Sequence, residues 1–345
     1  MHHWASRPFL RFLGRRVLAL VVLGIGITFV AFVLTQLVPG DPALANLGQV
    51  SSADPEAVAA YHKQWGLDRP LPVQYGTYLW NLMHGDLGES QQSHQPVLDD
   101  LRVAIPATAE LALLSILFAI AVGVPIGVVA AVRRDKPSDH GLRLVSLVGI
   151  SMPTFWLALV ALYVFFFRLG WFPGGGRLDP GILPPIGITG MYTIDALLTG
   201  EWSVAWDALH HLILPALVLA AFNVSLIMRY TRSAVLEVIN DDYIRAARAK
   251  GLPERTVISR HVLRAALPAI VTVLGLVFAN VLTGAVLVEN IFAWPGVGQY
   301  AYRASIELDL PAIMGVSLFV AVVYVIVNFV VDVLYGVIDP RIRLS

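Results

Sequence analysis

Six long apolar stretches divide the chain, and each is long enough to cross a lipid bilayer. They lie at residues 17–38, 107–131, 144–166, 212–228, 265–288 and 312–331. A helix needs about 20 mainly apolar residues to span the hydrocarbon layer. Glu110 is the only charged residue within these stretches. The pattern therefore predicts an all-α integral membrane protein with six transmembrane helices.

The basic residues predict the orientation of these helices. Eighteen of the 24 Arg and Lys residues lie in 1–16, 133–143, 229–264 and 332–345, and only six lie in the other polar segments. Loops rich in Arg and Lys stay in the cytoplasm. Both termini and the 229–264 segment are therefore expected in the cytoplasm. The external segments are then 39–106, 167–211 and 289–311.

Two features of the apolar stretches bear on their packing. Gly123 and Gly127 are four residues apart, which favours close helix packing over a role in gating. Pro153 lies within the third stretch and predicts a kink.

The first stretch is about twice as long as a signal-peptide core, so a retained anchor is favoured over a cleaved signal, although Ala43-Leu44-Ala45 follows it.

The external segment 39–106 is expected to be folded, because it is rich in aromatic and apolar residues. Helices are predicted at Ala57–Trp65 and Val73–His84, with a Pro-rich turn between them.

The cytoplasmic stretch 241–268 is predicted to form a helix, a turn and a second helix. Asp241 and Asp242 suit a helix start, and Tyr243–Lys250 favours helix. Gly251 suits the turn, and Pro253 suits the start of the next helix. A helix this short is marginal alone in water, so we expect something to pack against it.

Composition excludes several kinds of chemistry. The chain is 57% hydrophobic, has zero net charge and contains no cysteine, which rules out disulfides and thiolate catalysis. No Gly is followed by Lys, so a P-loop is absent and the chain itself is not expected to bind ATP. His2-His3 and His210-His211 are adjacent pairs, which is poor ligand spacing, so no metal site is expected. No HExxH or Gly-x-Ser-x-Gly occurs and no two carboxylates share an apolar stretch, so no catalytic residue is expected. The Arg residues follow the membrane topology, so nucleic-acid binding is not expected either.

Polar residues within the apolar stretches are candidates for a translocation path. Glu110 either lines such a path or lies at the level of the lipid headgroups. Asn223, Asn280 and Thr283 are expected to face a path or protein more often than lipid.

Several blocks, in this order, resemble the permease subunits of ABC importers, in particular the B-type subunit of the dipeptide, oligopeptide and nickel branch. The resemblance covers nearly the whole chain. The blocks are Gly66–Tyr75, Gly85–Gly88, Pro153 with Phe155-Trp156, Leu169–Pro173, His211–Pro215, Arg229 with Thr231-Arg232, Asp242–Gly251, Phe292 with Trp294–Gly298, and Asp339–Arg341.

The family has a cytoplasmic signature of Glu-Ala-Ala, three residues, Gly, nine residues and Ile-x-Leu-Pro. Aligned on Gly251, the triplet is Arg245-Ala246-Ala247 and the tail is His261–Arg264. The alanine pair, the glycine and Leu263 match, whereas the Glu, Ile and Pro do not. Any ion pair that needs Glu at position 245 is therefore in doubt.

The resemblance implies a type I importer fold in the bacterial cytoplasmic membrane, with no cofactor in this chain. ATP and Mg²⁺ would be bound by two ATP-binding cassette subunits, which receive the cytoplasmic helix. A similar C-type permease subunit would complete the path, and an external solute-binding protein would deliver the peptide. The implied coupling residues are Asp242, Tyr243, Arg245, Ala246, Ala247, Gly251 and Arg255, and the implied external gate is Trp294, Pro295, Gly296 and Gly298.

Two alternatives stay open at this stage. A member of the same family could import nickel or another non-peptide solute. An autonomous secondary transporter or channel, or an intramembrane enzyme, is less favoured, because the apolar stretches offer almost no ion-coupling groups and no internal repeat is visible.

Overall fold

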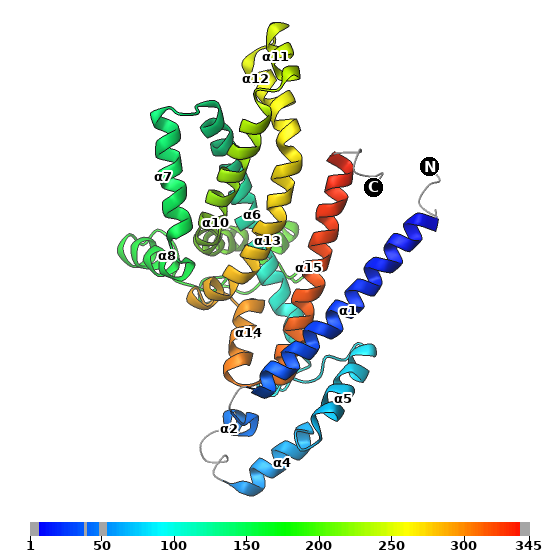
Figure 1. Ribbon diagram of the computed structural model, residues 1–345. Coiled ribbons are helices and arrows are strands. Elements are labelled where there is room, and N and C mark those ends of the chain that lie inside the picture. The colour runs from blue at the N-terminus through cyan, green and yellow to red at the C-terminus, as the bar shows by residue number, and fades with distance from the viewer. Residues whose placement is uncertain (1–6, 38–39, 48–53, 339–345) are drawn as a thin grey trace. The chain divides into compact units, whose positions relative to one another are not determined.

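The computed structural model describes residues 7–37, 40–47 and 54–338. The regular secondary structure of these residues is helical, apart from one isolated β-bridge between Glu89 and Pro96. Parts of the predicted end segments 1–16 and 332–345 lie outside the described residues. The chain divides into two compact units (Figure 1). The first contains Met1–Ala104 and Tyr300–Ile326, and the second contains Ile105–Gln299 and Val327–Ser345.

The helices are short in the external segments and long in the apolar stretches. In chain order they are α1 (Arg7–Leu37), α2 (Pro42–Asn46), α4 (Pro55–Trp65), α5 (Leu71–Met83), α6 (Val97–Val132), α7 (Pro137–Ser151), α8 (Thr154–Ala161), the π-helical η1 (Leu162–Arg168), α9 (Tyr192–Thr199), α10 (Trp202–Val238), α11 (Asp242–Ala249), α12 (Glu254–Thr256), the π-helical η2 (Val257–Val262), α13 (Leu263–Ile291), α14 (Val297–Ile306) and α15 (Leu310–Ile338).

Four helical segments in the described residues are long and apolar enough to cross a membrane. They are α6, α10, the continuous run Glu254–Ile291 and the Leu310–Val331 part of α15. A fifth is reached if α7 and the α8–η1 helix count as one broken span. In α1 the apolar helix available for this test is Val21–Leu34. The structure thus supports a multi-pass helical membrane protein, and the count of six spans stays a prediction.

The predicted kink at Pro153 is a sharper break than expected. The two parts of the third stretch, α7 and α8–η1, meet at 98°, so 144–166 is not one helix (Figure 1). Met152 is extended at φ −80° and ψ 123°. A residue before proline is pushed out of helical geometry by the proline ring, which explains why the helix ends there.

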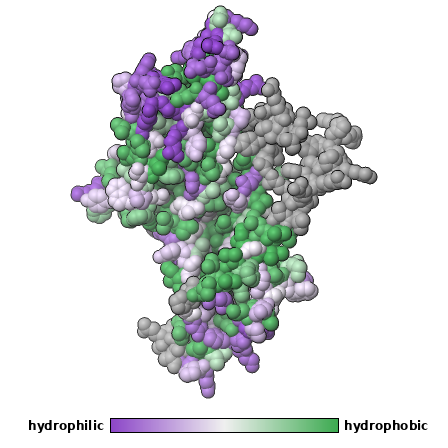
Figure 2. All heavy atoms as spheres, viewed as in Figure 1, coloured by the Kyte–Doolittle hydropathy of each residue, from purple (hydrophilic) through white to green (hydrophobic). Residues whose placement is uncertain are grey.

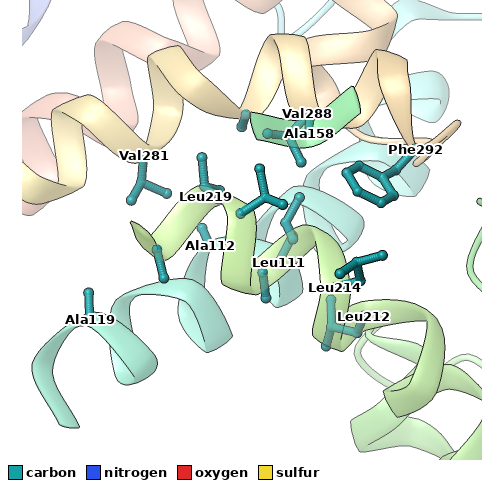
Figure 3. Close-up of a cluster of buried hydrophobic side chains, with 14 of the residues drawn as sticks. Leu111, Ala112, Ala119, Ala158, Leu212, Leu214, Leu219, Val281, Val288 and Phe292 are labelled. Carbon is teal, nitrogen blue, oxygen red and sulfur yellow. The ribbon is translucent and has the colours of Figure 1, made fainter. Parts of the chain in front are cut away.

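Helix α10 is the centre of the second unit. In α10, 72% of the apolar window is buried, against 28% to 33% in the other three segments. Its Leu219 lies in a cluster with Leu111 of α6, Ala158 of α8 and Val281 of α13 (Figure 3). The other helices of this unit are therefore placed largely by how they pack on α10.

The glycine pair of α6 makes one of these contacts close, as its spacing predicts. A Cβ on Gly127 would lie 2.7 Å from the backbone oxygen of Met228 and 2.7 Å from Cβ of Thr231. A Cβ on Gly123 would lie 2.9 Å from the Ile227 side chain. Small residues let two helix backbones approach this closely, which increases van der Waals contact where lipid provides no hydrophobic driving force.

The first unit contains the folded external segment. The two predicted helices are present as α4 and α5. Tyr75 of α5 donates a hydrogen bond to the backbone oxygen of Ile25 in α1 (3.0 Å) and lies against the rings of Phe29 and Phe32. The segment therefore folds back on the first apolar helix.

We predict that Gly127→Ala lowers the stability of the chain, because the added methyl overlaps a backbone oxygen that has no rotamer to move to. Overpacking of this kind costs about 1–3 kcal/mol. Thermal unfolding of the full chain in detergent would measure the effect.

Gly141→Ala in α7 is the matched control, since a Cβ there meets nothing within 4 Å. This change should leave the unfolding temperature equal or slightly raised, because alanine favours helix over glycine. Equal behaviour of the two variants would contradict the close packing of α6 on α10.

Candidate functional site

The candidate functional site is a small helix at one end of the second unit. Helix α11 follows α10 and precedes α12 and η2, and the three form the tip of this unit (Figure 1). Figure 2 shows hydrophilic side chains gathered over this tip. The helix-turn-helix predicted from the sequence is confirmed, except that the second helix continues without interruption into α13.

One face of α11 packs on its own chain. Ile244 is fully buried and Ala247 nearly so, in a cluster with Val235 of α10 and with Val257 and Val262 of η2. Ala131, at the end of α6, belongs to the same cluster. A helix of eight residues that would be marginal alone is thus held by α6, by α10 and by the continuous run Glu254–Ile291 that contains η2.

The other face of α11 is exposed, and most of the predicted coupling residues lie on it. These exposed residues are Asp242, Tyr243, Arg245 and Ala246, with Gly251 and Arg255 following in the turn and in α12. Ala247 differs, because it belongs to the buried face. Arg245, at the position where the signature has Glu, forms an ion pair with Asp242 one turn earlier, and both side chains are largely exposed. An exposed pair of this kind adds little stability.

The turn after α11 is fixed by Gly251 and by Arg248. Gly251 has φ +78°, a left-handed conformation that glycine adopts without steric cost. Arg248 donates to both carboxylate oxygens of Glu254 (3.2 and 2.9 Å) and to the backbone oxygen of Ile239 (3.2 Å). This side chain therefore ties together the end of α10, helix α11 and the start of α12.

A buried carboxylate, that of Asp139, attaches helix α7 to α10. Asp139 of α7 is fully buried and accepts two hydrogen bonds from Arg232 of α10, both at 2.9 Å. Arg143 contacts the same carboxylate at 2.5 and 3.2 Å. Breaking a buried pair of this type leaves an uncompensated charge, which is strongly unfavourable. The start of α7 is therefore firmly attached to α10.

The candidate path residues fall in two different environments. Asn280 and Thr283 of α13 are exposed on this chain, as are Thr272, Leu276 and Leu287 on the same face of the helix. Asn223 of α10 is 2% exposed, and its amide donates to the backbone oxygen of Leu219 (2.9 Å) while its Oδ1 has no partner. The structure therefore brings Asn280 and Thr283 to one open face and places Asn223 in the packed interior.

Glu110 is held in a buried ion pair. Its Oε2 accepts from Arg177 at 2.7 Å, and its Oε1 accepts from the backbone N–H of Thr193 at 2.7 Å. The Arg177 guanidinium lies 3.5 Å from the ring centre of Tyr192. Both side chains are about 95% buried. In this conformation Glu110 joins α6 to the 177–193 segment and faces neither an open path nor solvent.

The segment beside this pair is shaped by Asp195 at the start of α9. Its carboxylate accepts from the backbone N–H groups of Ile188, Thr189 and Gly190 and from the Thr189 hydroxyl. Burial works against ionisation, but these hydrogen bonds outweigh it, and the pKa of Asp195 lies below its ordinary value. The ionised carboxylate holds Gly190, whose backbone oxygen is the second acceptor for Arg177 (2.9 Å).

The predicted gate residues wrap around a second buried carboxylate, Glu289 at the end of α13. Its oxygens accept from the Thr108 hydroxyl (2.6 Å) and from the backbone N–H of Gln299 (2.9 Å). A Cβ on Gly296 would overlap the Glu289 carboxyl group. A Cβ on Gly298 would lie 2.6 Å from the Cα atom of Val286 in α13. The loop can therefore reach Glu289 only with glycine at these positions.

The other two gate residues of this loop, Trp294 and Pro295, differ in burial. Trp294 is 1% exposed and donates its indole N–H to the backbone oxygen of Ala107 (2.9 Å), whereas Pro295 is exposed. The loop is thus attached to α6 at two successive residues, Ala107 and Thr108.

Sequence reasoning missed Arg177, Asp139, Arg232 and Glu289. The Arg177–Glu110, Arg232–Asp139 and Glu289–Thr108 partners lie 67, 93 and 181 residues apart, so no spacing reveals these pairings. Glu289 carried a weak signal, since it is a charged residue that directly follows an apolar stretch.

Among the described residues, one group has the geometry to hold a metal ion. It consists of Asp179, Asp207 and His211, which lie apart from α11 and from the exposed face of α13.

Comparisons with known proteins agree with this picture. Residues 123–344 match the family described as the inner membrane component of binding-protein-dependent transport systems. Residues 9–112 match the family described as the N-terminal part of such membrane components.

The chain is also similar to curated proteins over nearly its full length. A probable D,D-dipeptide transport system permease protein of Escherichia coli (strain K12) is 45% identical over 97% of this chain and 98% of its own. A dipeptide transport system permease protein of Alkalihalophilus pseudofirmus is 42% identical over 95% and 98%. A di/tripeptide transport system permease protein of Pseudomonas aeruginosa (strain UCBPP-PA14) is 44% identical over 97% and 99%.

Among solved structures, an inward-facing MetNI methionine ABC transporter is similar with a TM-score of 0.49 and 16% identity, over 68% of this chain and 93% of that one. The family matches together reach from residue 9 to residue 344. The chain therefore belongs to the inner membrane components of binding-protein-dependent transport systems.

Proposed function

We propose that the chain is the membrane-spanning permease subunit of an ATP-driven importer of di- or oligopeptides. The observation that carries this proposal is the 42% to 45% identity, over at least 95% of the chain, to permeases named for dipeptide or di/tripeptide transport. Membership of this family favours an importer over the autonomous transporter, channel or intramembrane enzyme considered from the sequence.

The energy for import would come from other subunits. The chain contains no P-loop, so ATP and Mg²⁺ would be bound by two ATP-binding cassette subunits. A solute-binding protein on the outside would deliver the peptide, and a similar C-type permease subunit would stand opposite this chain. The N and C termini and α11 would then lie in the cytoplasm, as the distribution of Arg and Lys predicts.

The two faces of α11 suit it to transmit force from such an ATPase. The exposed face, with Asp242, Tyr243, Arg245 and Ala246, is free to enter a groove on the ATPase subunit. The buried face is fixed to α6, α10 and η2 through Ile244 and Ala247. A push on the exposed face would therefore move these long helices together and not bend α11 alone. Ala247 would act in this scheme as support and not as a contact residue.

The exposed face of α13 is our candidate for the wall of the path. The polar side chains of Asn280 and Thr283 lie there among apolar residues. Exposing such polar groups to lipid is unfavourable. One chain leaves this face uncovered, so the second permease subunit would close the path from the other side. Glu110 and Asn223 would contribute only in a conformation that releases them from their present surroundings.

The loop Trp294–Gly298 would move as a rigid piece if it acts as the external gate. Its attachment to Glu289 and to α6 leaves it little freedom of its own. Opening would then require α6 and the end of α13 to move with it.

The first test of the function uses the partner subunits. Replacing the P-loop Lys by Ala in both ATPase subunits should reduce uptake of a radiolabelled dipeptide to the level of cells without the permease. Uptake that continues at the normal rate in this background would contradict an ATP-driven importer.

The second test concerns the turn after α11. Gly251→Val should lower ATPase co-purification and peptide uptake severalfold, because a β-branched residue at φ +78° is strained although the site has space for it. Gly251→Asn is the matched control, since asparagine tolerates this conformation, and it should retain most of both activities. If Val and Asn behave alike, the left-handed turn is not what coupling requires.

The third test concerns the path. The absence of native cysteine allows single cysteines to be read without background. A membrane-impermeant, water-soluble thiol reagent should label Asn280→Cys and Thr283→Cys in the assembled importer, and labelling should change when ATP is trapped. Val281→Cys, at a fully buried position between them, should stay unlabelled. Protection of all three positions would place this face against lipid or protein.

A further inference from the structure

Asp179, Asp207 and His211 form a group, here called the triad, that none of the roles above uses. One oxygen or nitrogen of each residue lies within 4.8 Å of the others. Asp207 and His211 are four residues apart in α10, so both project from the same side of that helix. Asp179 is brought to them by its backbone N–H, which donates to Asp207 Oδ2 (2.9 Å).

The hydrogen bonds of His211 determine where its proton lies. Its Nδ1 is 2.9 Å from the backbone oxygen of Asp207. A carbonyl oxygen can only accept, so Nδ1 must carry hydrogen and Nε2 presents a lone pair in the neutral ring. Nε2 points at Asp179 Oδ1, 3.5 Å away, which is also an acceptor. Two acceptors that face each other attract only when a positive charge, a proton or a metal ion, lies between them.

The distance between His211 Nε2 and Asp179 Oδ1 favours the metal ion. A charge-assisted hydrogen bond between an imidazolium and a carboxylate would be about 2.7–2.9 Å. Two ligands of one tetrahedral ion, each about 2.0–2.2 Å from it, lie about 3.4 Å apart. The observed 3.5 Å matches the second arrangement. Two carboxylates and a neutral imidazole also balance the charge of a divalent ion.

The surroundings of the triad match those of metal ligands. A ligating histidine usually donates its other ring N–H to a carbonyl or carboxylate, which holds the ring in place, and His211 does this. Asp207 is held in turn by the N–H of Asp179. The His211 side chain is 2% exposed and Asp207 12%, whereas Asp179 is 62% exposed. An ion would thus reach the triad from solvent and complete its coordination with water.

We propose that the triad binds a divalent metal ion with borderline ligand preference, Zn²⁺ in the first place. One imidazole and two carboxylates suit such an ion better than Ca²⁺ or Mg²⁺, which prefer oxygen ligands alone. The ion joins Asp179 to α10 two residues after Arg177, the partner of Glu110. Its role is to fix this segment on α10, and it is not the transported solute.

Zn²⁺ binding to the full-length chain tests the proposal. The protein is purified in detergent without a polyhistidine tag, with His2 and His3 replaced by Ala, stripped with a chelator and dialysed against Zn²⁺. Elemental analysis should find one Zn²⁺ per chain, and Zn²⁺ should raise the unfolding temperature. His211→Gln and Asp179→Asn should each weaken binding by about 10-fold or more.

His210→Gln is the matched control, because the His210 ring binds the backbone oxygen of Trp171 and not the triad. It should bind Zn²⁺ like the parent protein. Asp179 is exposed, so Asp179→Asn should fold normally and decides the result even if His211→Gln does not fold. The proposal is overturned if the parent binds no stoichiometric Zn²⁺, or if Asp179→Asn binds it unchanged. It is also overturned if Zn²⁺ leaves the unfolding temperature of the parent protein unaltered.

Discussion

The second unit depends on the close packing of α10. Apolar side chains gain little by leaving lipid for protein, so helices in a membrane associate through tight van der Waals contact and a few polar bonds. Helix α10 has both. Its backbone meets the glycines of α6 at contact distance, and its Arg232 pairs with Asp139 of α7. The same helix then leads directly to α11, so the packed interior and the exposed tip share one continuous element.

Buried charges in this unit serve as attachment points between distant segments. Asp139 joins α7 to α10, Glu110 joins α6 to the 177–193 segment, and Glu289 joins the end of α13 to α6. Asp139 and Glu289 lie near helix ends, and Glu110 lies near the start of its apolar stretch, so none of the three is in the middle of an apolar stretch. At these depths a carboxylate can find Arg, Ser, Thr or free backbone N–H groups, whereas the centre of a span offers few. The apolar middles are left to pack by shape alone.

Local patterns were predictable from the sequence, and pairings were not. Hydrophobicity located the helices, glycine spacing located the close contact at Gly127, and Gly251 located the turn after α11. The sequence predicted only a kink at Pro153, whereas the two helices meet at 98°. The size of this angle depends on what α8 packs against and not on the proline alone. The partners of Glu110 and Glu289 lie 67 and 181 residues away. A single sequence does not reveal contacts across such distances. For the same reason the sequence predicted helix α11 but not that Ala247 lies on its buried face, since that depends on contacts with α6, α10 and η2.

The division of α11 into two faces has an evolutionary consequence. Among its eight residues, Ile244 and Ala247 are buried in the interior of the chain and Arg248 fixes the following turn, whereas Asp242, Tyr243, Arg245 and Ala246 are exposed. Mutations at these four positions would therefore cost little in folding, and if α11 docks on the ATPase subunit as proposed, they would change which ATPase the chain accepts. Arg245, which pairs with its neighbour Asp242, is one of these exposed residues. Paralogous importers within one cell could keep their motors apart, or share them, through this short surface alone.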